Sequence, residues 1–201
     1  MEQIGFLSIP AHTPQAQALF DEDEAELGYV MNVSRLWAYQ PATMAGLFEL
    51  MPQSLAEANL SSRQRGILVA AAASSRQDSC CSLAWGSKLA HAASPAIAAA
   101  VIRGDDAALA GNERVMASWA RKVVRDPNAT TSTDIQALRD AGFADAQIFA
   151  MTTFVALRLA FSTINDALGA TPDAELHRSS PPEVVAAAAF GRPADGDPAA
   201  A

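Results

Sequence analysis

Cysteine is nearly absent from this sequence of 201 residues, and the only two, Cys80 and Cys81, are adjacent. Two neighbouring cysteines do not provide the spacings of a disulfide framework, so we expect no structural disulfide. Histidine is equally sparse, because its three residues lie far apart at positions 12, 91 and 177. No metal-ligand spacing results. We therefore predict no metal ion and no other cofactor.

Basic residues and long apolar runs are also scarce. Lys and Arg number 14 against 22 Asp and Glu, a net charge of −8, and they form no cluster. Phosphate binding requires clustered basic residues, so nucleic acid is not an expected partner. The longest apolar runs, 67–73 and 96–102, are far shorter than the roughly 20 residues that span a bilayer. The first residues, MEQIGFLSIP, do not resemble a signal peptide. We expect no membrane partner and a cytoplasmic location.

The residues that are abundant favour helices. Hydrophobic residues make up 50% of the chain and charged residues 18%, which is typical of a packed globular protein. Alanine and leucine are the most frequent residues, while β-branched runs are few. These features predict an all-α fold of about eight or nine helices. Caps, prolines and glycines place them at about 14–27, 32–38, 41–58, 62–77, 80–92, 95–103, 110–126, 134–141 and 145–168.

The composition changes near residue 170. Residues 1–170 are predicted to form one helical domain, whereas 171–201 are rich in proline, alanine and polar residues. We expect this C-terminal tail to be partly disordered over its last ten or so residues. A helical turn at 183–190 is predicted to dock on the body or on a partner.

Four stretches, in this order and spacing, carry a resemblance to a known family. They are ELGYVMNVSRLWAYQPATMAGLF, LSSRQRGILVAAAASS, WARKVVRDPNATTSTDIQALRDAGFADAQIF and INDALG, and they cover most of residues 15–170. The chain resembles the alkylhydroperoxidase D-like (AhpD-like) / carboxymuconolactone decarboxylase superfamily, in its peroxidase-related branch. This resemblance implies an oligomeric, all-α helical bundle.

Active members of that superfamily carry a Glu, then Cys-x-x-Cys, then a His one turn later. A thiolate at a helix N-terminus is favoured by the helix dipole, the second Cys resolves the sulfenic acid, and His and Glu move the proton. Aligned on this chain, the Glu falls on Gly66, the first Cys on Asp78, the second on Cys81 and the His on Trp85. Ser162-Thr163 stands where relatives tend to carry Asn-Arg. Of the four residues of the family's relay, this chain therefore keeps only the cysteine at position 81.

The two cysteines are expected to have different roles. Neighbours on a helix point about 100° apart, and a vicinal disulfide is strained, so Cys80 is expected to be a small buried hydrophobe. Cys81 lies in the first helical turn, where a thiolate is favoured. Asp78 is placed either to cap the Cys81 amide or to act as an acid or base, and its charge opposes a thiolate. Trp85 should make the site drier than that of the relatives.

Arg158 lies within the apolar stretch MTTFVALRLAFSTI. Two interpretations remain open. The guanidinium either reaches solvent or pairs with a carboxylate of the protein, or it anchors a ligand that carries a carboxylate. The candidate catalytic residues are thus Cys81 and Asp78, and the candidate substrate-binding residues are Trp85, Arg158, Cys80 and Gly66.

Three functions fit these features. The first is an atypical peroxidase-related oxidoreductase that uses Cys81 alone on a hydroperoxide, with an external thiol as reductant. The second is a non-redox enzyme for a small organic acid, lactone or biosynthetic intermediate, since the fold does not fix the reaction. The third is a catalytically silent binding or assembly protein. Under each interpretation the resemblance implies that the chain pairs with itself as a homo-oligomer, and the first two imply a small-molecule substrate.

Overall fold

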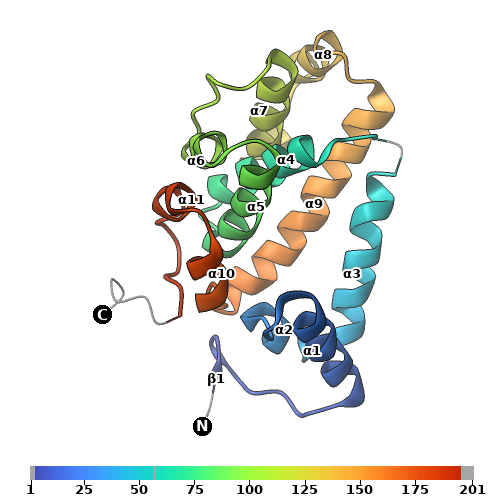
Figure 1. Cartoon of the computed structure of the whole chain (residues 1–201). Helices are drawn as coiled ribbons and strands as arrows, with labels where there is room; N and C mark the ends of the chain where they lie inside the picture. Colours follow the sequence, from blue (N-terminus) through green and yellow to red (C-terminus); the bar gives the residue numbers. More distant parts are fainter. Residues whose placement is uncertain (1–2, 57, 196–201) are drawn as a thin grey trace.

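The computed structural model describes residues 3–56 and 58–195, and helices dominate it (Figure 1). Eight of its helices have seven residues or more, in agreement with the predicted all-α fold of eight or nine helices. The helices are α1 (Pro14–Leu27), α2 (Asn32–Trp37), α3 (Pro41–Ser54), α4 (Ser62–Ser75), α5 (Ser79–Ala92), α6 (Pro95–Arg103), α7 (Gly111–Arg125), α8 (Ser132–Asp140), α9 (Asp145–Ala167), α10 (Ala174–Ser179) and α11 (Pro182–Ala187), with a 3-10 turn at Pro127–Ala129.

Two short strands at the N-terminus were not expected from the sequence. β1 (Gln3–Ile4) pairs antiparallel with β2 (Leu7–Ser8). Strands of two residues are too short to leave a recognisable alternation of apolar and polar residues. Gly5 has a φ of +57°, and a Cβ there would lie 2.3 Å from the carbonyl oxygen of Leu168, so the turn of this hairpin requires glycine.

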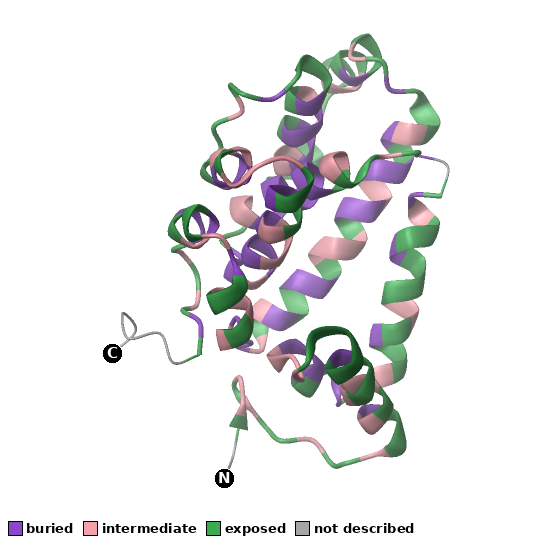
Figure 2. Cartoon of the chain, in the orientation of Figure 1, coloured by how far each residue is buried: buried purple, intermediate pink, exposed green. Residues whose placement is uncertain are grey.

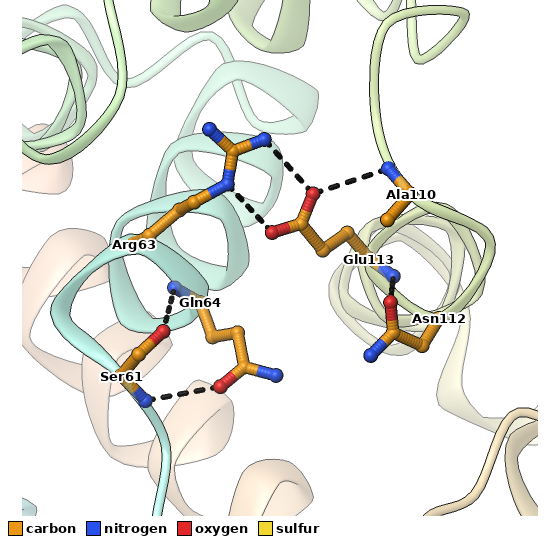
Figure 3. A network of polar contacts seen from close by, with 6 residues as sticks. All are labelled: Ser61, Arg63, Gln64, Ala110, Asn112 and Glu113. Atoms are coloured by element: carbon orange, nitrogen blue, oxygen red, sulfur yellow. Dashed lines mark hydrogen bonds and ion pairs between the residues drawn. The ribbon is translucent and has the colours of Figure 1, made fainter.

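The helices begin where the sequence supplies capping residues. The Thr13 hydroxyl accepts a hydrogen bond from the Ala16 amide just before Pro14, and the Ser61 hydroxyl accepts one from the Gln64 amide. The Gln64 side chain in turn accepts a hydrogen bond from the Ser61 amide, which completes a capping box (Figure 3). These bonds satisfy amides that a helix leaves free at its start.

Helix α4 forms the centre of the core. It packs against α5, α6, α7 and α9, and all eight residues from 66 to 73 are buried (Figure 2). A helix that is apolar on every side must be covered on every side. The run GILVAAAA therefore places α4 inside the bundle, as its small side chains predicted.

A partly buried ion pair joins the starts of α4 and α7. Arg63 donates from Nε to Oε1 of Glu113 at 2.6 Å and from Nη2 to Oε2 at 2.9 Å (Figure 3). Glu113 also accepts a hydrogen bond from the amide of Ala110. The hydrogen bonds from Arg63 lower the pKa of Glu113 below its usual value. This bidentate pair fixes the register of the two helices.

The C-terminal residues up to 195 lie against the body (Figure 1). α11 falls within the helical turn that was predicted at 183–190, and it packs on α5 and α6 with Val184 fully buried. A Cβ on Gly86 of α5 would lie 2.7 Å from both Val184 and Ile102, so the absence of a side chain permits this contact. The predicted disorder covers about the last ten residues, of which 196–201 lie outside the described residues.

A set of hydrogen bonds fastens the chain after α9 to α2. Asp173 accepts a hydrogen bond from the amide of Asn32 at 2.7 Å. Asp195 accepts hydrogen bonds from the side chains of Asn32 and Thr171, each at 2.7 Å. Burial raises the pKa of Asp173 to about 6, although the Asn32 amide acts in the opposite direction. Burial, followed by the charge of Asp78, likewise raises the pKa of Asp166 to about 6.

Replacing Gly86→Ala should destabilise the protein by about 1–3 kcal/mol, because the new methyl group pushes Val184 and Ile102 apart in a packed core. Denaturant unfolding measures this change. The matched control is Gly46→Ala on α3, where a Cβ meets nothing within 4 Å. There alanine should stabilise the helix by about 0.5–1 kcal/mol. Equal effects of the two substitutions would contradict the packing of α11 on α5.

The protein should become more stable as the pH falls from 7 to 5. The folded-state pKa values of Asp166 and Asp173 lie near 6, above the value of 3.8 that is ordinary for an aspartate in an unfolded chain. In this window the folded protein therefore binds protons that the unfolded chain does not, and the free energy of unfolding rises. Asp173→Asn should reduce the rise, as measured by denaturant unfolding at both pH values. An equal rise in the free energy of unfolding in the unchanged protein and in Asp173→Asn would refute the assignment to Asp173.

Candidate functional site

The tight turn between α4 and α5 sets the position of the two cysteines. Gln77 has a φ of +57°, which is uncommon for a residue with a side chain. The amide of Asp78 donates to the carbonyl of Ala73 at 3.1 Å. Oδ1 of Asp78 then accepts a hydrogen bond from the amide of Cys81 at 2.8 Å, so Asp78 caps α5. One of the two predicted roles of Asp78, the capping of Cys81, is therefore present.

Cys81 is buried, with 7% of its surface exposed, and Cys80 is half-buried. Both are free thiols. Burial, followed by the charge of Asp78, raises the pKa of each thiol well above its usual value. Arg158 acts in the opposite direction on Cys81 but does not outweigh the other causes. At neutral pH both side chains are thus protonated thiols in the resting protein.

Helix α9 supplies two polar groups beside Cys81. The hydroxyl of Ser162 donates to Oδ2 of Asp78, and its oxygen lies 3.5 Å from Oδ2 of Asp166. Asp78 therefore uses one carboxylate oxygen on α5 and the other on α9. This contact joins the N-terminus of the thiol-bearing helix to the last turns of α9 (Figure 1).

Arg158 lacks the carboxylate partner that one interpretation of the sequence gave it, and the residue is half-buried. It forms no ion pair with any carboxylate of the described residues. Its Nη1 lies 3.3 Å from the sulfur of Met51, and its guanidinium carbon lies 4.7 Å from the ring centre of Trp85. Its Nε is buried without a hydrogen-bond partner in that part of the chain. Burial lowers the pKa of Arg158, while Cys81 and Asp78 act to raise it.

Trp85 carries two cations on its ring. Besides Arg158, the ammonium of Lys88 lies 4.8 Å from the ring centre. Burial, followed by the charge of Arg158, lowers the pKa of Lys88. The edge of the Trp85 ring also meets Phe154 of α9 at 6.4 Å between ring centres. Where the resemblance places a proton-carrying imidazole in active relatives, this chain has an aromatic surface that binds cations.

A small void lies next to Cys81. Its volume is about 10 Å³, which is close to the least that holds one water molecule. The lining residues are Val69, Ala72, Ala73, Arg76, Asp78, Cys81, Val124, Arg158, Leu159 and Ser162. The structure thus brings together Cys81, Asp78 and Arg158 among the predicted site residues.

Three other predicted site residues lie outside this lining. A Cβ on Gly66 would lie 3.0 Å from the Cβ of Leu89, so the missing side chain serves the contact between α4 and α5. Cys80 does not line the void, and the pKa of its thiol is raised by burial, then by the charges of Asp78 and Asp173. Trp85 reaches the void only through Arg158.

The rest of the described chain offers no metal site, and its larger hollow lies away from Cys81. No group of three or more His, Cys, Asp or Glu residues in the described ranges could hold a metal ion. A larger hollow of about 730 Å³ lies between the N-terminal hairpin, α1, α2 and the residues near Asp195, and Cys81 does not line it.

Neither Ser162 as a partner of Asp78 nor the presence of Asp166 nearby was predicted from the sequence. A signal was available, because Arg158, Ser162 and Asp166 recur at intervals of four residues and therefore share one face of α9. What the spacing does not reveal is that this face turns toward the start of α5.

Comparison with known proteins supports the fold. No protein-family model matches the chain, and no curated protein matches it in sequence. An uncharacterized peroxidase-related protein from Silicibacter sp. TM1040 superposes with a TM-score of 0.76 at 22% identity, over 88% of this chain and 95% of that one. An uncharacterized peroxidase-related protein with an alkylhydroperoxidase AhpD core, from Ralstonia eutropha JMP134, gives 0.76 at 21% identity over 88% and 96%. The predicted resemblance is thus confirmed at the level of the fold, which is that of the AhpD-like, peroxidase-related proteins.

Proposed function

We propose that the protein is a peroxidase-related oxidoreductase in which the single thiol of Cys81 reduces a small hydroperoxide. The observation that carries this proposal is the meeting of Cys81, Asp78 and Arg158 around one void. A nucleophile, a carboxylate that accepts a proton and a cation that stabilises negative charge are the groups that such a reaction needs. The shared fold with peroxidase-related proteins adds support by analogy.

The reaction transfers one oxygen atom to sulfur. The Cys81 sulfur attacks the terminal oxygen of ROOH, the O–O bond breaks, and Cys81 becomes a sulfenic acid while ROH leaves. The thiol proton passes through the Asp78 carboxylate to the departing RO⁻. An external thiol, R′SH, then forms a mixed disulfide with Cys81 and releases water, and a second R′SH restores the Cys81 thiol and leaves as R′SSR′.

The need for an external thiol follows from the position of Cys80. Its backbone position next to Cys81 on the same helix directs the two side chains apart, and the two thiols are unbonded. Cys80 is therefore a poor resolving residue. A supply of reducing thiol is typical of the cytoplasm, which is the location that we propose for the protein.

The void restricts the substrate. Its volume of about 10 Å³ matches one water-sized molecule. Hydrogen peroxide requires little more space, whereas a branched organic hydroperoxide requires the lining helices α4, α5, α7 and α9 to separate. We therefore propose hydrogen peroxide, or the exposed end of an unbranched hydroperoxide, as the substrate.

A second candidate is a non-redox enzyme or binding protein for a small organic acid. Arg158 favours it, because a buried Nε without a partner and the absence of an ion pair among the described residues leave the guanidinium free for a carboxylate. Thermal unfolding in the presence of small carboxylic acids separates the two candidates, because a bound acid raises the midpoint.

Cys81→Ser should abolish peroxide reduction, because a hydroxyl does not form a sulfenic acid. The measurement is consumption of hydrogen peroxide with dithiothreitol as reductant, together with mass spectrometry of the protein after a single addition of peroxide. Cys80→Ser is the matched control and should retain turnover and the gain of one oxygen atom on Cys81. Turnover that survives Cys81→Ser would reject the proposal.

Arg158→Gln should slow peroxide reduction by about a hundredfold, because the substitution removes the cation that stabilises the thiolate and the departing oxygen. It should also move the pH profile of Cys81 alkylation toward higher pH, since Arg158 acts to lower the pKa of this thiol. Arg158→Lys should restore part of the rate and part of the pH profile. Arg65→Gln, at an exposed position at the start of α4, should change neither the rate nor the pH profile. An unchanged pH profile would show that Arg158 serves packing alone.

A further inference from the structure

The hollow of about 730 Å³ near the N-terminus has the size of a small-molecule site. Such sites usually measure about 300–1,000 Å³. Its walls come from three parts of the chain, which are residues 3–12, the helices α1 and α2, and the segment that follows α9. Cys81 does not line it, and neither of the two candidate functions uses it.

Large apolar side chains line this hollow without being covered. Phe6 is 65% exposed and Ile9 is 54% exposed. Ile4, Pro10 and Phe20 belong to the same wall. An apolar molecule in the hollow would remove the surface of these side chains from water, and that burial favours binding.

The backbone holds this apolar wall in place before any ligand arrives. The amide of Phe6 donates to the carbonyl of Leu168 at 2.9 Å, and the hydroxyl of Tyr39 donates to the carbonyl of Ser8 at 2.7 Å. Gly169 has a φ of +86°, and a Cβ there would lie 2.8 Å from the Phe6 ring, so only glycine lets the ring lie so close. A wall that is already fixed loses little conformational freedom when a ligand binds.

Two arginines give the hollow an excess of positive charge. Arg35 of α2 and Arg192 line it together with one carboxylate, that of Asp195. Neither arginine forms an ion pair with a carboxylate in the part of the chain that the structure describes. Asp195 accepts its hydrogen bonds from two uncharged side chains. With His12 counted as neutral, two positive charges and one negative leave the lining at +1, in a chain whose net charge is −8.

We propose that this hollow binds a small molecule that has an apolar body and a carboxylate. The guanidinium carbon of Arg192 lies 5.1 Å from the ring centre of Phe6, so a cation and the apolar wall adjoin. A guanidinium binds a carboxylate through two parallel hydrogen bonds. A carboxylate paired there leaves the body of its molecule against Phe6 and Ile9. This site is separate from the proposed reaction of Cys81.

The first test compares three probes by isothermal titration calorimetry on the full chain. Decanoate, below the concentration at which it forms micelles, should bind as one molecule per chain. Decanol lacks the charge and acetate lacks the apolar body, so each should bind at least about tenfold more weakly. Absence of decanoate binding, or equal binding of decanol or of acetate, would overturn the proposal.

The second test removes the cations of the lining. Arg35→Gln with Arg192→Gln should weaken decanoate binding by at least about tenfold, because the carboxylate loses its charged hydrogen bonds. Arg65→Gln with Arg103→Gln is the matched control. It removes the same charge from two exposed positions outside the lining and should leave the affinity unchanged. Circular dichroism and thermal unfolding verify that each variant is folded. Equal affinities of the two double variants would contradict the assignment to this hollow.

A third set of variants locates the bound acid. Ile9→Asn should weaken decanoate binding severalfold, because it makes the apolar wall polar. Cys81→Ser and Arg158→Gln should bind decanoate like the unchanged chain, since neither residue lines the hollow. Loss of binding in Arg158→Gln would place the acid beside Cys81 and would overturn this inference. Failure of the protein to reduce peroxide would leave the result for decanoate intact.

Discussion

The carboxylate of Asp78 is the constraint on which the site depends. It is 1% exposed, and a charge at that depth is tolerated only where hydrogen bonds replace water. One oxygen accepts the Cys81 amide at the start of α5, and the other accepts the Ser162 hydroxyl on α9. A single side chain thereby caps one helix and fastens it to another. Removing either contact would leave a buried carboxylate oxygen without a partner, so the turn, the cap and the placement of α9 depend on one another.

This arrangement determines whether Cys81 is a thiol or a thiolate. The N-terminus of a helix contributes the equivalent of about half a positive charge, which favours a thiolate. Burial and the charge of Asp78 oppose it and dominate, so the pKa of Cys81 is raised. A reaction of Cys81 must therefore move its proton within the site rather than begin from a standing thiolate. Asp78 lines the same void and can accept that proton, while the Arg158 guanidinium stabilises the negative charge that the proton leaves on sulfur. The site differs in this respect from the relay that the resemblance implies.

Local sequence signals predicted the parts of the structure that local physics determines. Thr13, Ser61 and Asp78 were recognisable as caps, and the run GILVAAAA required a buried helix. The surroundings of Arg158 were not predictable, because they depend on how α3, α5 and α9 converge. An expected partner for that cation was a carboxylate, and the structure provides the sulfur of Met51 and the ring of Trp85. The partners come from helices 73 to 107 residues away in the chain, a distance over which helical periodicity carries no information.

Helix α9 joins the site to the surface. Its inner face holds Arg158 and Ser162, and Leu159 and Ser162 line the void, while its outer face is uncharged. Positions separated by four residues repeat on the same side of a helix, so the two sets of residues do not compete for space. The void beside Cys81 is lined by residues of α4, α5, α7 and α9, so it can widen only if the packing of these helices changes. Access to the thiol therefore depends on the same contact between Asp78 and Ser162 that fastens α5 to α9.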